Sequence, residues 1–116
     1  MSIKSISVIG PCFNEEENID EYITRTLKSL EKLNLDYKII LIDDGSKDNT
    51  WAKILSHTNN NKKIIGLKFT RNFGHQSALM AGLNIANSDY IFCSDVDLQD
   101  PPELLEKMFE KIEKKN

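Results

Sequence analysis

The sequence contains little cysteine or proline and has no long apolar run. It has 116 residues, with two cysteines, three prolines and one tryptophan. Cys12 and Cys93 lack the CxxC spacing of a zinc site, so we expect both to be reduced thiols near strand ends rather than a disulfide. The longest uninterrupted aliphatic stretch covers residues 39–42, far short of the ~20 apolar residues that a membrane helix requires.

The chain also lacks a cluster of basic residues. Fifteen Lys and Arg stand against 18 Asp and Glu, which gives a formal net charge of −3. Nucleic-acid backbones require a basic face, so we expect no nucleic-acid partner. Residues 1–4 carry no cleavable hydrophobic segment, which predicts a cytoplasmic protein. With 40% hydrophobic residues, the chain is too apolar for disorder, and its length suits a single domain over residues 1–116.

Short β-branched runs alternate with amphipathic stretches along the whole chain. The runs predict strands over residues 3–9, 37–42, 63–69 and 89–93. Apolar residues at helical spacing predict helices around residues 19–33, 51–55 and 78–85, and a fourth that opens with Asp100 as N-cap. Trp51, Met80 and Met108 lie in these patterns and are expected in the core. The order predicts an α/β fold, a mainly parallel sheet of about four strands with helices on both faces.

All four predicted strands are followed by polar loops. These loops cover residues 10–18, 43–48, 71–76 and 94–100, whereas the opposite edge carries turn formers such as residues 59–61. Ligands of open parallel sheets bind beyond the carboxyl ends of the strands. The asymmetry therefore predicts a ligand site at that edge.

Asp95 and Asp97 follow the last strand and lie two residues apart. Their carboxylates and the Gln99 carbonyl are hard oxygen donors, suited to Mg²⁺ or Mn²⁺ bridged to phosphate oxygens. The alternative is that they are turn and cap residues, as we expect for Asp100. Their place at the end of a buried strand favours the metal interpretation.

Asp43 and Asp44 follow the most apolar strand. They could accept hydrogen bonds from a base N–H or a ribose hydroxyl, with Gly45 allowing a positive φ. The alternative is an ordinary Asp-Gly turn that leads into the next helix. Arg71 is a fixed cation that could face a diphosphate, or a surface residue that pairs with a loop carboxylate.

The first and third loops add further candidates. Pro11 is expected to end the first strand and to fix the loop that carries Asn14 and Glu15. Glu15 could contact a base edge or cap a helix that begins near residue 16. Gly74 and His75 would open a helix whose N-terminal amides favour anions. His75 is then an orienting or capping group, because no partner for a nucleophilic triad is visible.

Neither GxGxxG nor GxxxxGK[ST] occurs in the chain. The strand-end segments instead resemble glycosyltransferase family 2, inverting enzymes of the GT-A nucleotide-sugar fold. The likeness is greatest to the polyprenyl-phosphate branch, the dolichyl- and undecaprenyl-phosphate sugar transferases. The segments are PCFNEE at residues 11–16, DDGS at 43–46, RNFGHQ at 71–76 and DVDLQDPPE at 95–103. Gly10 departs from the family's usual aliphatic residue before the proline, and this is expected to loosen the end of the first strand slightly.

The resemblance implies transfer of a hexose from a UDP- or GDP-sugar, assisted by Mg²⁺ or Mn²⁺, to a polyprenyl phosphate or a cell-envelope glycan. It implies nucleotide-sugar contacts from Pro11, Asn14, Glu15, Asp44, Arg71, Gly74 and Asp95, beside the Asp43 expected above, and metal ligation by Asp97 and Gln99. Family members continue well beyond this length, so the chain resembles the nucleotide-binding N-terminal half. The catalytic base is then expected beyond residue 116, and this chain is expected to bind a donor without turning over an acceptor.

Two other classes of function remain open at this point. One is a non-catalytic nucleotide-binding or interaction fragment, which is compatible with the resemblance. The other is a phosphoacceptor receiver domain, which would need an aspartate after the third strand, where Arg71 and Asn72 stand. The open edge of the last strand could also pair with a second copy of the chain.

Overall fold

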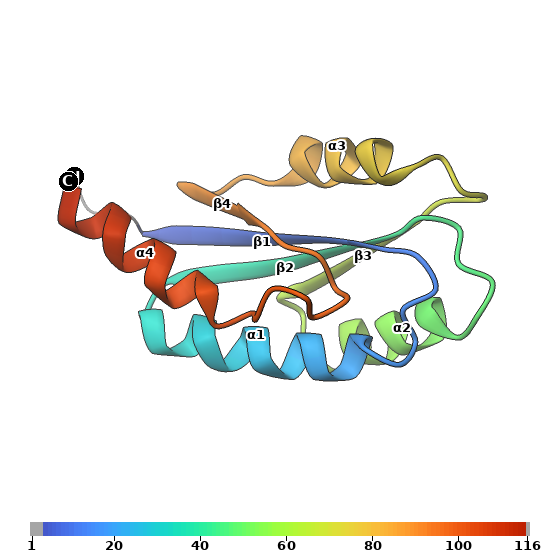
Figure 1. The fold of residues 1–116 in the computed structure, drawn as a ribbon, viewed down its shortest axis with the longest axis horizontal. Coiled ribbons are helices and arrows are strands. Elements are labelled where there is room, and N and C mark those ends of the chain that lie inside the picture. The colour runs from blue at the N-terminus through green and yellow to red at the C-terminus, as the bar shows by residue number, and fades with distance from the viewer. Residues whose placement is uncertain (1–3, 116) are drawn as a thin grey trace.

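The computed structural model describes residues 4–115 and confirms the alternation of strands and helices (Figure 1). Ile3, which the sequence placed in the first strand, lies outside the described residues. The strands are β1 (Ser5–Cys12), β2 (Asp36–Asp43), β3 (Ile64–Lys68) and β4 (Tyr90–Cys93). The helices are α1 (Ile19–Leu33), α2 (Thr50–Asn60), α3 (His75–Ile85) and α4 (Leu104–Lys115).

The four strands form one sheet in the order β3-β2-β1-β4, and every pair is parallel. The central strand β2 is buried from Ile39 to Asp43, as expected for a strand covered on both faces. Because all strands run the same way, their carboxyl ends and the loops that follow them meet at one edge. The predicted parallel sheet is therefore confirmed.

Helices cover both faces of the sheet, as predicted, but unequally. Helices α1, α2 and α4 pack on one face, where Tyr22, Leu41 and Leu105 belong to the larger core cluster (Figure 1). Helix α3 covers the other face, where its Ala78 packs against a smaller cluster. Gly82 lets α3 approach closely, because a Cβ at that position would lie 2.5 Å from a methyl of Ile9.

The prediction that Pro11 ends the first strand is wrong, because β1 continues through Pro11 to Cys12. The carbonyl of Ile9 accepts the N–H of Ser94, so the N–H and C=O groups of Ile9 point toward β4. Backbone groups alternate in direction along a strand, and those of Pro11, two residues later, therefore point toward β4 as well. Strand β4 ends at Cys93, which is paired with Ile9. Among residues 4–115, no strand pairs with β1 where the missing N–H of Pro11 would point, and the proline is therefore tolerated inside the strand.

The predicted starts of two helices also need correction. Helix α4 begins at Leu104, and Asp100 is not its N-cap. The N–H groups of Leu104 and Leu105 donate to Pro101 and Pro102 in a tight turn. Two successive prolines disfavour a helical conformation at the first of them, which delays the helix. Helix α1 likewise begins at Ile19 rather than near residue 16.

Core membership is predicted only in part. Trp51 packs against the larger cluster, but Met80 and Met108 are 49% and 47% exposed. The two cysteines are free thiols, with Cys12 buried and Cys93 exposed. Within residues 4–115, no helix has both the length and the apolar composition needed to cross a lipid bilayer.

Candidate nucleotide and metal site

A cavity of about 220 Å³ opens at the carboxyl edge of the sheet, between the ends of β1 and β4 and the start of α3. It contains five of the predicted site residues together with His75. Its lining consists of Pro11, Cys12, Phe13, Glu15, Asp44, His75, Asp95, Val96 and Asp97. The sequence-based prediction that polar residues gather at this edge is thus confirmed, and all four loops contribute, the third only through His75.

The first loop is tied to the second by hydrogen bonds at Asn14 and Glu15. Asn14 has a left-handed backbone with φ of 54°, its N–H donates to Ser46 Oγ at 2.8 Å, and its Oδ1 accepts from the N–H of Lys47 at 2.9 Å. The N–H of Glu15 donates to Thr50 Oγ1 at 2.8 Å. Asn14 therefore shapes the rim of the site rather than lining the cavity.

Glu15 lies in the cavity lining and also contacts the start of the first helix. Its Oε1 accepts from Asn18 Nδ2 at 2.9 Å, and its carbonyl accepts from the N–H groups of Asn18 and Ile19. The Glu15 carboxylate does not cap the helix, because the N-cap of α1 is Asn18 and receives no side-chain cap hydrogen bond; Glu15 instead binds the Asn18 side chain and lines the cavity. Its contact with a base stays a prediction.

The second loop contains two acidic residues with different environments. Asp43 is fully buried, its Oδ1 accepts from the N–H of Ser46 at 3.0 Å, and its Oδ2 has no hydrogen-bond partner among the described residues. Gly45 has a φ of 76°, which confirms the predicted left-handed turn. Asp43 thus stabilises the turn at residues 43–46 through its hydrogen bond with Ser46, whereas Asp44 lines the cavity.

Asp44 holds the third loop in place. Its Oδ1 accepts from the N–H of Phe73 at 2.8 Å, and its Oδ2 accepts from the N–H of Gly74 at 3.1 Å and from Asn72 Nδ2 at 3.2 Å. Gly74 has a φ of 103°, a region that essentially only glycine adopts. The carboxylate is thus already engaged with three donors, and Gly74 permits the sharp entry into α3.

Arg71 lies apart from the acidic pair. Its guanidinium stacks 3.9 Å above the ring of Phe73, and its Nη1 donates to the carbonyl of Asn72 at 3.3 Å. It lines a neighbouring cavity, and Phe13 lines both. The structure therefore does not bring Arg71 together with Asp97, and its contact with a diphosphate stays a prediction.

His75 is the residue whose partner the sequence did not reveal. Its Nε2 lies 3.1 Å from Oδ1 of Asp95, across the cavity edge. The sequence order gave no signal for this pair, because β3 and β4 lie at opposite edges of the sheet. Helix α3 crosses over β1 and β2 and brings its first residue to the end of β4. The Asp95 carboxylate is therefore the partner that His75 would orient.

The cavity is electrostatically suited to a cation. Carboxylates of Glu15, Asp44, Asp95 and Asp97 contribute to its lining, and His75 is the one basic side chain among the lining residues. Such a concentration of one charge attracts counter-ions. The Cys12 thiol is no competitor, because burial, reinforced by the Asp43 and Glu15 carboxylates, raises its pKa far above the usual value and keeps it protonated.

Asp95 and Asp97 fit a cation that arrives with phosphate groups. No group of three or more His, Cys, Asp or Glu residues that could hold a metal ion occurs within residues 4–115. Magnesium is usually held by one or two carboxylates and completes its sphere with phosphate oxygens and water. Asp95 and Asp97 both line the cavity and supply the two carboxylates that this requirement names.

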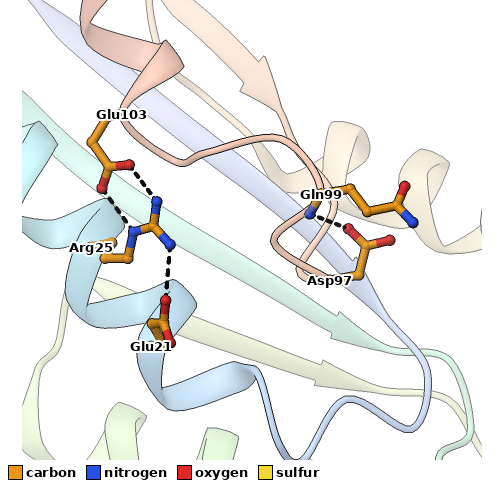
Figure 2. A network of polar contacts seen from close by, with 5 residues as sticks. All are labelled: Glu21, Arg25, Asp97, Gln99 and Glu103. Carbon is orange, nitrogen blue, oxygen red and sulfur yellow. Dashed lines mark hydrogen bonds and ion pairs between the residues drawn. The ribbon is translucent and has the colours of Figure 1, made fainter.

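Gln99 contributes through its backbone to the turn that carries Asp97. Its N–H donates to Oδ1 of Asp97 at 3.1 Å, and Figure 2 shows the two side chains extending from the same turn. The Gln99 side chain is exposed and does not line the cavity. Its role as a metal ligand stays a prediction.

Comparison with known proteins identifies the family. Residues 7–116 match the description "Glycosyl transferase family 2". The chain is 42% identical over 108 residues to the undecaprenyl-phosphate 4-deoxy-4-formamido-L-arabinose transferase of Proteus mirabilis, a match that covers 91% of this chain and 33% of that protein. The chain therefore spans about a third of the length of this relative.

Two solved structures have the same fold. S. aureus TarS 1–349 in complex with UDP-GlcNAc superposes with a TM-score of 0.70 at 25% identity, over 95% of this chain and 31% of that one. The Pyrobaculum calidifontis mannosyltransferase PcManGT, in complex with GDP-Man and Mn²⁺, gives 0.67 at 20% identity, over 83% of this chain and 32% of that one. The receiver-domain alternative is thereby set aside. The chain belongs to glycosyltransferase family 2, and its sheet is the Rossmann-like half of a GT-A fold.

Proposed function

We propose that this chain binds the diphosphate of a UDP- or GDP-sugar together with Mg²⁺ or Mn²⁺, as the donor-binding part of an inverting hexosyltransferase. The observation that carries the proposal is that Asp95 and Asp97 both line an acidic cavity at the carboxyl edge of the sheet. TarS was solved with UDP-GlcNAc, and PcManGT with GDP-Man and Mn²⁺, which supports this class of ligand. The name of the Proteus relative supports a polyprenyl phosphate as acceptor, with a cell-envelope glycan as the alternative.

Different residues of the cavity would bind the cation and the nucleoside. Asp95 and Asp97 would hold the cation, with Gln99 fixing the turn that carries Asp97. Glu15 and Asp44 line the same cavity as Phe13 and would face the nucleoside. A bound divalent cation neutralises charge that develops on a departing diphosphate. The Asp44 bonds to residues 72–74 keep the start of α3, and with it His75, beside Asp95.

Calorimetric titration of UDP and GDP, with and without Mn²⁺, tests the proposal directly. We expect nucleotide binding that depends on Mn²⁺ and that Asp97→Asn weakens by at least about tenfold, because a lost metal contact costs that much or more. The matched control is Asp36→Asn, which removes the same charge from an exposed position at the opposite edge of the sheet. Binding that is indifferent to Mn²⁺, or equal in Asp97→Asn and the unaltered chain, would contradict the proposal.

The outer edge of β4 supports a second, separate proposal of self-association. Within residues 4–115, β4 pairs with β1 on one side only. Ser94 donates toward β1, so the N–H of Cys93 points to the outer edge. No lysine or proline occurs in β4 to discourage pairing. Two copies could therefore join their β4 strands into one continuous sheet.

Sedimentation equilibrium over a range of protein concentrations tests this pairing. We expect a concentration-dependent dimer that Cys93→Pro abolishes, because proline removes an outer-edge donor without removing a bond to β1. The exposed substitution Leu83→Ser, on helix α3, controls for a general loss of apolar surface. A chain that stays monomeric at every concentration would disprove self-association.

A further inference from the structure

Helix α1 presents three polar side chains in a row toward the segment that carries the acidic pair. Tyr22, Arg25 and Ser29 are spaced by three and four residues, so they lie on one side of the helix. Tyr22 Oη is hydrogen-bonded to Ser94 Oγ. Arg25 binds Glu103, and Ser29 Oγ donates to Glu106 Oε2 at 2.7 Å. Tyr22 and Arg25 therefore hold the two ends of the segment 94–103, which we call the acidic loop, and Ser29 holds the helix that follows it.

The acidic loop is constrained between these two ends. Val96 is buried and packs where Gly10 has no side chain, since a Cβ on Gly10 would lie 3.2 Å from a methyl of Val96. Leu98 has a φ of 65°, which is unfavourable for a residue with a Cβ and persists only where the surroundings impose it. The conformation that points Asp95 and Asp97 at the cavity thus depends on fixed ends.

The contact between Arg25 and Glu103 has the geometry of a strong ion pair. Arg25 Nε donates to Glu103 Oε2 at 2.9 Å, and Nη2 donates to Oε1 at 2.6 Å, so the two planar groups meet in a fork (Figure 2). The remaining nitrogen, Nη1, donates to Glu21 at 2.9 Å on the same helix. Glu21 therefore orients the guanidinium, and only an arginine can make both parallel bonds to Glu103.

We propose that Arg25 is a positioning residue for the cation and the donor diphosphate. Through Glu103 it fixes the carboxyl end of the acidic loop, and so it sets where the Asp95 and Asp97 carboxylates lie relative to the cavity. The inference rests on the proposed function, because it assigns Arg25 and Glu103 to the same binding site. Neither residue lines the cavity itself.

Two measurements on the same set of variants test the inference. Titration with Mn²⁺ and UDP should show about tenfold weaker binding in Arg25→Met and in Glu103→Gln, within the range by which residues that do not touch a ligand modulate its binding. The double variant should be no weaker than either single one, because the pair acts as one unit. Hydrogen exchange without ligand should be faster in residues 94–103 of each variant, while the free energy of unfolding changes little, because the pair is exposed.

Two further variants serve as controls. Glu110→Gln breaks an exposed ion pair of similar length, 3.2 Å to Lys114, and should change neither binding nor exchange in the acidic loop. The exchanged pair Arg25→Glu with Glu103→Arg should restore both only in part, because Glu21 would repel the carboxylate placed at position 25.

The outcomes separate this inference from the proposed function. If the unaltered chain binds neither Mn²⁺ nor UDP, the proposed function fails and the assignment of Arg25 fails with it, whatever the exchange data show. If the unaltered chain binds but Arg25→Met and Glu103→Gln bind equally well, the proposed function stands and the positioning role is disproved. Full additivity of the two substitutions would also overturn it.

Discussion

Gly45→Ala should lower the free energy of unfolding by about 3 kcal/mol or more, the sum of backbone strain and steric overlap. Gly45 has a φ of 76°, where a side chain is disfavoured. An added Cβ would lie 2.3 Å from the carbonyl carbon of Arg71 and 2.4 Å from the nitrogen of Asn72. Both are backbone atoms, so the second and third loops would have to separate. Urea denaturation of the two proteins measures the difference.

Gly74→Ala is the matched control for this prediction. Gly74 also has a positive φ, of 103°, but a Cβ there would meet nothing within 4 Å. We therefore expect only the conformational cost, about 1–3 kcal/mol. An equal loss of stability in both variants would show that the overlap with Arg71 and Asn72 does not matter.

Asp44→Ala is the second substitution with a large expected effect, about 3 kcal/mol of unfolding free energy. It removes a nearly buried carboxylate that accepts three hydrogen bonds from residues 72–74. Hydrogen bonds to a charged group contribute about 1.5–3 kcal/mol each, and water at this partly open site replaces some of that loss. Nucleotide binding should weaken as well, since His75 follows directly on the released loop. Denaturation and calorimetry on one preparation measure both effects.

Asp44→Asn tests how much of this stabilisation depends on the charge of the carboxylate, because asparagine keeps nearly the same shape. The amide keeps one oxygen, which can still accept from the N–H of Phe73, but its NH₂ group cannot accept from Gly74. We expect a smaller loss, about half that of the alanine variant. If Asp44→Ala is as stable as the unaltered chain, the carboxylate does not hold the third loop.

The order of elements could be predicted from the sequence because each strand and helix has its own local periodicity. The run at residues 39–42 and the pattern of Ile19, Tyr22 and Ile23 specify β2 and α1 without reference to the rest of the chain. The end of β1 could not be predicted in this way. Whether Pro11 interrupts a strand depends on which neighbour its backbone faces, and that follows from the strand order.

The sequence predicts which residues gather at the candidate site, but not which side chains contact one another. The loops around Glu15, Asp44 and Asp97 do meet at one edge, as parallel strands require. The partnership of His75 with Asp95 and that of Arg25 with Glu103 join residues from distant parts of the chain. Charge patterns along a sequence do not encode such contacts, because the path of each helix across the sheet determines them.

The early end of β4 has a further consequence for how the cavity can be closed. Beyond Cys93 the flank of β1 presents Pro11, which offers no amide hydrogen to an incoming strand. A segment that paired with β1 itself beyond Cys93 would find no donor at Pro11, whereas the outer edge of β4 is unaffected. The proline thus leaves the cavity side of β1 without a donor for strand pairing at the point where Pro11 lines the cavity.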